Sequence, residues 1–482
     1  MTLMLTTLLR DSRALAALAV PLILTQLAQV ALTTTDTVMM GLLGTRELAA
    51  GGLALVIFNQ LRTMGVGLVT SVGNQIAAAG ARAEQAEQAE AERTAGRDDD
   101  GRGHAQEEAH EEMRGIVRAS LALATLAGLA GAVLMILIGQ ALPWLGQDAA
   151  VADRAQTMLF ALAPGLLPCL WFQAIRQFTV GMRRPQALLR ITVASVAVNA
   201  GLNWVLIHGT WGLPRMGLTG VGVATSSVYV LTCIALYVSA RKDGALAPLL
   251  ALDVMKADPA VLRRLLRLGL PIAATYGSEA GFFSLTALMA GSFGPAALAA
   301  HTAVNQLVYI VFQVAVGLSH AASINVSREL AVGRYEDAGR IKNTALACAA
   351  AVMTVVGVVY LTLPELVLAP FLESGSGQAL TIATHLLVVT AFLQFFDCAQ
   401  NIGVGLLRGL DDTRSGFRIT LIGYWAVGLP AAWLLAYALE LDTLGIWLGL
   451  LTGLATTAVL LLRRYAQSLT TRSARHTPLT AT

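Results

Sequence analysis

Three acidic residues lie inside long apolar stretches of the chain, where charged side chains are rare. They are Asp36 within QVALTTTDTVMMG, Glu279 within PIAATYGSEAGFF and Asp397 within FLQFFDCAQNIGVG. A carboxylate at the centre of a bilayer raises the free energy of insertion by at least about 2.5 kcal/mol, so such a residue usually serves a function. The chemistry it offers is reversible binding of a proton or a small cation. The alternative is structural pairing with an arginine or a polar neighbour.

Two asparagines, Asn199 and Asn203, stand four residues apart within VNAGLNWVLI. This spacing places both on one helical face, and burying two carboxamides is unfavourable unless a partner satisfies them. One carboxylate with several neutral oxygens suits Na⁺, and it suits a proton equally well. The simpler alternative is a hydrogen bond between neighbouring membrane helices, for which Asn is often used.

Basic and aromatic residues accompany the acids in the same stretches. Arg62 and Arg176 are candidate counter-charges, and Arg176 is also placed to snorkel toward the inner interface. Tyr276 and Phe283 stand near Glu279, where their rings can stack on a flat cation. Packing or lipid contact is the alternative for both rings.

The overall composition indicates a polytopic membrane protein. Of the 482 residues, 56% are hydrophobic and 13% are charged, whereas soluble domains carry about 25% charged residues. Moreover, 17 of the 63 charges fall in residues 81–118, so the rest of the chain is still more apolar. This composition excludes a soluble enzyme, a nucleic-acid partner and a disordered chain. The four cysteines stand singly, so we expect no disulfide frame, and we expect no cofactor and no metal beyond Na⁺.

Twelve stretches are long and apolar enough to cross a bilayer as helices, which needs about 20 residues each. With both ends of the chain in the cytoplasm, the outer loops hold only Arg46, Arg154 and Arg215, as the positive-inside rule requires. We therefore expect a multi-pass protein of the plasma (inner) membrane with both termini cytoplasmic. The expected spans lie near residues 14–41, 48–79, 116–142, 156–178, 188–208, 217–240, 265–290, 297–326, 343–369, 380–407, 416–438 and 443–463.

An internal repeat divides the chain into two halves. A shift of 250 residues pairs eleven identical residues over 48 positions, among them Pro21 with Pro271 and Gly67 with Gly317. The repeat predicts an all-α fold of two six-helix bundles related by a pseudo-twofold axis along the membrane normal, as in secondary transporters. The expected domains are an N-terminal bundle over 1–240, which contains a hydrophilic cytoplasmic insert at 81–118, a cytoplasmic linker over 241–264, a C-terminal bundle over 265–465 and a tail over 466–482.

Several of these segments together resemble the MATE (multidrug and toxic compound extrusion) family, in particular its NorM-like branch. The resemblance covers about residues 14–463 and is carried by PLILTQLAQVALTTTDTVMMG, VNAGLNWVLIHG, GLPIAATYGSEAGFF, ALAAHTAVNQ and GVGLLRGLDDTRSGFRITLIGYWAVGLP. It implies two V-shaped six-helix bundles that alternate between inward-open and outward-open states. It also implies export of cationic, amphipathic drugs or dyes in exchange for Na⁺ or H⁺, by a protein that acts as a monomer.

The resemblance assigns roles to individual residues. Asp36 matches the family's acidic position in the first helix, and Asn199 and Asn203 match two polar positions in the fifth, where the DinF-like branch carries Asp in place of Asn203. Glu279 and Asp397 match the acidic positions of helices seven and ten. Pro21 matches a proline at which the first helix of some relatives bends, which makes it a candidate hinge.

Two other functions are alternatives to efflux. A lipid-linked oligosaccharide flippase of the same superfamily shares the two-bundle plan, but its pyrophosphate cargo favours several Lys or Arg, and here three acids face mainly Arg62 and Arg176. An intramembrane enzyme needs a nucleophile with a base, or a metal set, at membrane depth. The spans contain no HExxH or GxSxG motif, so we expect a transporter and not an enzyme.

Overall fold

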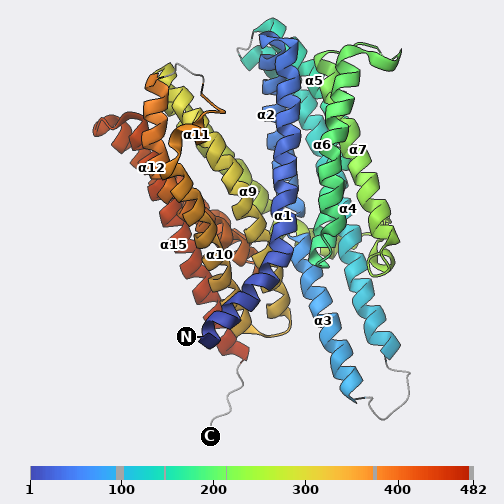
Figure 1. The fold of residues 1–482 in the computed structure, drawn as a ribbon. Coiled ribbons are helices and arrows are strands. Elements are labelled where there is room, and N and C mark those ends of the chain that lie inside the picture. The colour runs from blue at the N-terminus through green and yellow to red at the C-terminus, as the bar shows by residue number, and fades with distance from the viewer. Residues whose placement is uncertain (1, 94–101, 146–147, 213, 373–376, 477–482) are drawn as a thin grey trace. The chain divides into compact units, whose positions relative to one another are not determined.

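The computed structural model describes residues 2–93, 102–145, 148–212, 214–372 and 377–476, and these contain helices and no strand (Figure 1). Eleven helices in this part of the chain are long and apolar enough to span a membrane. The twelfth expected span lies in α8 (Pro259–Gly291), a helix of 33 residues whose apolar character is interrupted by Glu279 and its small polar neighbours. The expected all-α polytopic membrane fold is thereby confirmed.

The chain packs into two compact units. Unit 1 consists of Met1–Ile23 with Thr275–Thr482, and unit 2 consists of Leu24–Ala274. Both boundaries fall inside helices, α1 (Thr2–Leu43) and α8, a few residues after Pro21 and Pro271. A proline inside a helix removes one backbone hydrogen bond and weakens the helix locally, so each boundary follows a natural weak point. The boundaries expected from sequence, and the role of Pro21 as a hinge, stay predictions.

Unit 2 holds the helices of the first half of the sequence. After α1 come α2 (Thr45–Val69), α3 (Val72–Arg93), α4 (Arg102–Ala141), η1 (Leu142–Leu145), α5 (Ala149–Gly181), α6 (Gln186–His208), η2 (Thr210–Gly212), α7 (Leu218–Lys242), η3 (Ala247–Leu249) and η4 (Val254–Lys256). The expected insert at 81–118 is helical where it is described, because it forms the end of α3 and the start of α4. These two helices run side by side (Figure 1) and are joined by the ion pair of Arg82 with Glu112 at 2.6 Å. Residues 94–101 of the insert lie outside the described part of the chain.

Unit 1 holds the helices of the second half. They are α9 (Pro295–Ala331), α10 (Tyr335–Thr362), α11 (Pro364–Leu368), α12 (Gly377–Gly409), α13 (Thr413–Leu421), η5 (Ile422–Gly428), α14 (Leu429–Trp433), η6 (Leu434–Ala438) and α15 (Asp442–His476). The N-terminal end of α1 also belongs to this unit, where Asp11 accepts a hydrogen bond from Arg340 of α10 at 2.5 Å.

The segment from α13 to η6 is wound partly as π-helix, over Ile422–Gly428 and Leu434–Ala438. Pro430 lies between the two π segments. A proline has no backbone N–H, so it cannot donate the hydrogen bond that a regular α-helix requires at its position. Gly428 packs on Gly453 of α15 so closely that a Cβ built on Gly453 would lie 2.8 Å from the Cα of Gly428. Single π-turns often occur at functional positions, and this one carries Tyr424.

Two glycines hold the proline-bearing helix ends in place, each within one unit. In unit 2, Gly67 of α2 faces Ala273 of α8, and a Cβ on Gly67 would lie 2.7 Å from the Ala273 Cα. In unit 1, Gly317 of α9 faces Ile23 of α1, and a Cβ there would lie 3.0 Å from the Ile23 backbone nitrogen. Gly67 and Gly317, like Ile23 and Ala273, are related by the shift of 250 residues, so the same packing is built twice.

The contact at Gly67 leads to a stability prediction. Gly67→Ala is expected to lower the stability of the protein by about 1 to 3 kcal/mol, since the new methyl group would overlap α8 backbone atoms. Gly80→Ala in α3 is the matched control, because no atom lies within 4 Å of a Cβ there. This control should be neutral or stabilising, since Ala is favoured over Gly in helices by about 1 kcal/mol. Thermal unfolding in detergent measures both variants, and equal melting temperatures would contradict the prediction.

Candidate functional site

Asp36 lies in unit 2 with only 1% of its surface exposed, and its hydrogen-bond partners are neutral. The carboxylate oxygen Oδ1 accepts from Asn199 Nδ2 at 3.0 Å and from Asn203 Nδ2 at 2.8 Å. Its Oδ2 accepts from Thr225 Oγ1 of α7 at 2.9 Å. Among the described residues no Lys or Arg forms an ion pair with Asp36, so its negative charge is solvated by dipoles and remains available to a cation or a proton.

The two asparagines form one polar face on α6 and have fully buried side chains. Asn203 Nδ2 also donates to Asn199 Oδ1 at 2.6 Å. The Asn203 Oδ1 atom is buried and has no hydrogen-bond partner in the described part of the chain. A buried acceptor without a donor is unfavourable, and oxygen atoms are the ligands that hard cations prefer. Together with Asp36, this oxygen provides part of a ligand set for a small cation.

Unit 1 contains a second acidic site, made by Glu279 of α8 and Asp397 of α12. The two side chains lie close enough for their charges to interact. Tyr424 donates its hydroxyl to Glu279 Oε1 at 3.1 Å, and Asn401 Nδ2 donates to Asp397 Oδ1 at 3.2 Å. No Lys or Arg among the described residues pairs with either acid. Because like charges repel, a proton or cation held by this pair is stabilised by both carboxylates.

Aromatic rings surround the acidic pair of unit 1. Phe282 stacks on Tyr424 with ring centroids 4.9 Å apart, which orients the tyrosine that bonds Glu279. Phe283 meets Phe282 edge-on at 5.8 Å and packs against the core of the unit. Tyr276 is half-buried, one turn of α8 before Glu279. Roles for Tyr276 and Phe283 in binding a flat cation stay predictions.

The two arginines named as candidate counter-charges donate to carboxamides. Arg62 Nε donates to Asn59 Oδ1 at 3.3 Å. Arg176 is 4% exposed and donates to Gln173 at 3.1 Å and to Gln26 at 3.2 Å. Neither of these hydrogen bonds reaches an acid, and a counter-charge role for the two arginines stays a prediction.

Comparison with known sequences decides the family. A sequence model of MatE matches residues 107–205 and 271–434. The chain is 35% identical over 463 residues to a probable multidrug resistance protein NorM from Pseudomonas aeruginosa. The alignment covers 93% of this chain and 88% of that relative. A NorM relative from Mesorhizobium japonicum is 34% identical, over 95% of this chain and 94% of its own length. The chain belongs to the MatE family.

Solved structures show the same fold for this MatE protein. An outward-facing multidrug resistance MATE family transporter of the MOP superfamily superimposes with a TM-score of 0.82 at 17% identity, covering 96% of this chain and 98% of that one. The eukaryotic MATE transporter AtDTX14 gives a TM-score of 0.78 at 20% identity over 97% and 99% of the two chains. Membership of the family makes the chain a multi-pass membrane transporter and confirms that it is not an enzyme.

Three residues of these sites were not singled out from the sequence of the MatE protein. Asn401 follows Asp397 by four residues, the same spacing as Asn199 and Asn203, so a search for polar residues one turn from a buried acid would have found it. Thr225 carries no such signal, because single threonines are common in membrane helices. Tyr424 reaches Glu279 only because its π-helical segment packs beside α8.

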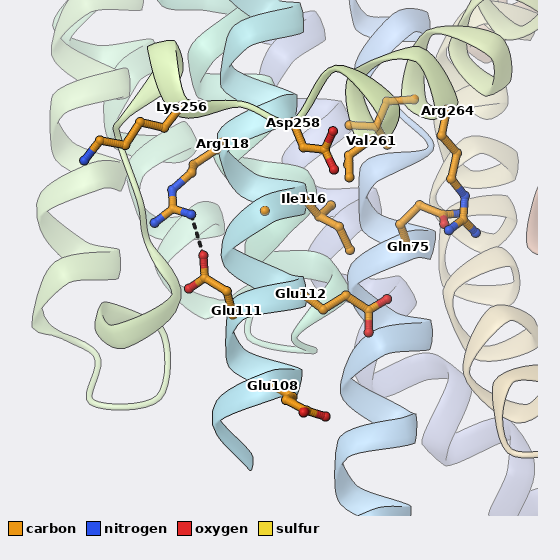
Figure 2. A pocket seen from close by; sticks show the side chains of 12 residues that line it. Gln75, Glu108, Glu111, Glu112, Ile116, Arg118, Lys256, Asp258, Val261 and Arg264 are labelled. Atoms are coloured by element: carbon orange, nitrogen blue, oxygen red, sulfur yellow. Dashed lines mark hydrogen bonds and ion pairs between the residues drawn. The ribbon is translucent and has the colours of Figure 1, made fainter. Parts of the chain in front are cut away.

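A cavity of about 540 Å³ lies in unit 2, among α3, α4 and the segment that leads into α8 (Figure 2). Arg118 faces this space and pairs with Glu111 at 2.6 Å. The charges that line it are mixed, which is typical of a hydrated surface and differs from the uncompensated acids described above. The charged lining residues are Glu108, Glu111, Glu112, Asp258, Arg118, Lys256 and Arg264.

Proposed function

We propose that this MatE protein is a secondary active multidrug efflux antiporter, which exports cationic, amphipathic drugs or dyes in exchange for Na⁺ or H⁺ by alternating access. One observation carries the proposal: Asp36, Glu279 and Asp397 are held in membrane helices by neutral hydrogen-bond donors, and none of them is neutralised by a Lys or Arg among the described residues. Such acids attract cations. A lipophilic cation suits this site because its charge pairs with a buried acid and its apolar surface suits the membrane interior.

Exchange follows from competition for the same negative charge. An ionised, unoccupied carboxylate attracts the cationic drug, and the arriving Na⁺ or H⁺ then neutralises that carboxylate. The electrostatic attraction for the drug falls as the charge is lost, so the drug leaves on the side from which the ion came. The ion is released on the opposite side, which restores the acceptor. The exchange is coupled because the drug and the ion each bind more tightly to one of the two conformational states, and each prefers a different state.

The names of the relatives agree with this function. Those from Pseudomonas aeruginosa and Mesorhizobium japonicum are named probable multidrug resistance proteins, and each aligns with more than nine-tenths of this chain. We further propose that the protein acts as a monomer in the plasma (inner) membrane with both termini cytoplasmic. The distribution of Lys and Arg supports this orientation, since only Arg46, Arg154 and Arg215 fall in the expected outer loops.

Reconstituted protein tests the function directly. Purified protein in liposomes loaded with ethidium should release the dye when a Na⁺ gradient or a pH gradient is imposed separately, and only slowly without either. Protein-free liposomes and liposomes treated with an ionophore for the imposed ion are the controls. If dye release were the same without a gradient as with either gradient, antiport would be excluded.

A further inference from the structure

A small cavity of about 30 Å³ lies in unit 2, and its lining includes Thr33, which is one helical turn before Asp36 in α1. Six of its lining residues carry neutral polar groups, and three different helices supply them. We call these six residues the polar column: Gln29 and Thr33 of α1, Thr192 and Ser195 of α6, and Tyr229 and Thr232 of α7. A water molecule needs roughly 10 to 15 Å³ measured in this way, so the cavity has room for about two.

The polar column continues the polar face that holds Asp36. Thr33 precedes Asp36 by three residues, and Ser195 precedes Asn199 by four. On α7, Tyr229 follows Thr225 by four residues. Each offset is one helical turn, or about 5.4 Å, and all three point toward the side where α1 and α6 begin and α7 ends. The positive-inside distribution predicts that this side is cytoplasmic.

Three hydroxyl groups of the polar column are oriented as acceptors. Thr192 donates to the Leu188 carbonyl at 2.8 Å, Ser195 donates to the Thr192 carbonyl at 2.7 Å, and Thr232 donates to the Val228 carbonyl at 2.9 Å. Because their protons are used within their own helices, their lone pairs are what they offer to a water molecule in the cavity. Polar groups in this number inside a membrane protein are unfavourable unless water or an ion satisfies them.

We propose that the polar column holds water and carries protons between Asp36 and the cytoplasmic side of unit 2, so that the ion exchanged at Asp36 is H⁺. This inference rests on the function proposed above and names its coupling ion. In the step itself, the O–H bond of the Asp36 carboxyl group breaks as a cavity water gains that proton. The water then passes another of its protons onward, and the charge leaves as hydronium.

The size of the cavity favours a proton over a metal ion. A hydrated Na⁺ exceeds a space for two waters, whereas a proton passes between waters already in place. Arg62 of α2 is a charged group that lines the cavity. The other charged or titratable groups in this region are Cys169 of α5 and Cys233 of α7, together with Tyr229, while α6 supplies only neutral side chains to this wall. At the end of the polar column nearest the start of α1, Arg176 donates to Gln26, which is one turn before Gln29.

A double variant that removes hydroxyls from the polar column tests the inference. Thr192→Val with Ser195→Ala keeps the packing volume nearly unchanged but removes two acceptors from the cavity wall. Ethidium efflux driven by a pH gradient in proteoliposomes should fall about tenfold, a loss comparable with that of one buried hydrogen bond. Ethidium binding in detergent and thermal unfolding should not change. The hydroxyl-retaining variant, Thr192→Ser with Ser195→Thr, should restore efflux.

The matched control removes two buried hydroxyls from elsewhere in the chain. Ser120→Ala with Thr420→Val is suitable, because both side chains are buried and donate to carbonyls of their own helices. This control should transport like the wild type. Wild-type efflux from the Thr192 and Ser195 double variant would overturn the polar column as a proton path. If a Na⁺ gradient drove efflux by the wild-type protein and a pH gradient did not, the polar column would also be overturned as a proton path, although antiport itself would stand. If neither gradient drove efflux, the proposed function and this inference would be overturned together.

Discussion

Asp36→Asn is expected to reduce ion-driven ethidium efflux by roughly 100-fold, which corresponds to about 2.7 kcal/mol in the rate-limiting barrier. The carboxamide has nearly the same shape, but it neither binds a proton near neutral pH nor carries the charge that attracts a cation. It also brings an NH₂ group to a position where Asn199, Asn203 and Thr225 already donate, so one donor there loses its acceptor. Dye efflux from proteoliposomes under an imposed ion gradient measures the change.

Membrane insertion must be unaffected for that result to bear on mechanism. Asp253→Asn is a suitable control, because Asp253 pairs with Lys256 on η4 and its side chain is 58% exposed. It should transport at the wild-type rate. Efflux by Asp36→Asn within about twofold of the wild type, in protein that inserts and unfolds normally, would mean that Asp36 is structural.

Glu279→Gln and Asp397→Asn should each reduce the same efflux by roughly 100-fold, and combining them should lower it by no more than about threefold further. The expected non-additivity has a geometric reason, since the two carboxylates interact with each other and are held by Tyr424 and Asn401 as one site. Once either charge is lost, the remaining acid no longer shares a cation with its partner. A double-mutant cycle on efflux rates measures this coupling.

An acid outside the pair is the control for this cycle. Glu365→Gln at the start of α11 changes an exposed side chain of unit 1 and should leave efflux unchanged. If the effects of Glu279→Gln and Asp397→Asn multiplied fully in the double variant, the two acids would act at separate sites. Wild-type efflux from both single variants would remove unit 1 from the mechanism.

Most of the helical architecture was predictable from sequence, because apolar length is a local property. Each expected span falls in a long helical stretch, although the one from α13 to η6 alternates between α- and π-helix, and even α8 keeps its helical form although Glu279 interrupts its apolar character. The helical start of α4 within the hydrophilic insert was less predictable, since that segment was compatible with a partly helical or a disordered state. The π-helical turns around Tyr424 were not predictable, because they depend on Pro430 together with close packing on α15.

Residue type and position in the chain were enough to single out Asp36, Glu279 and Asp397, since a charge in an apolar stretch is visible without any fold. The periodicity of one helix likewise placed Asn199 and Asn203 on a common face. Which side chains surround each acid was decided only by tertiary structure: Thr225 reaches Asp36 from a helix 189 residues away, and Tyr424 reaches Glu279 across 145 residues. Local patterns specify which groups a helix presents, whereas the partners of those groups depend on how separate helices pack, and no single stretch of sequence contains that information.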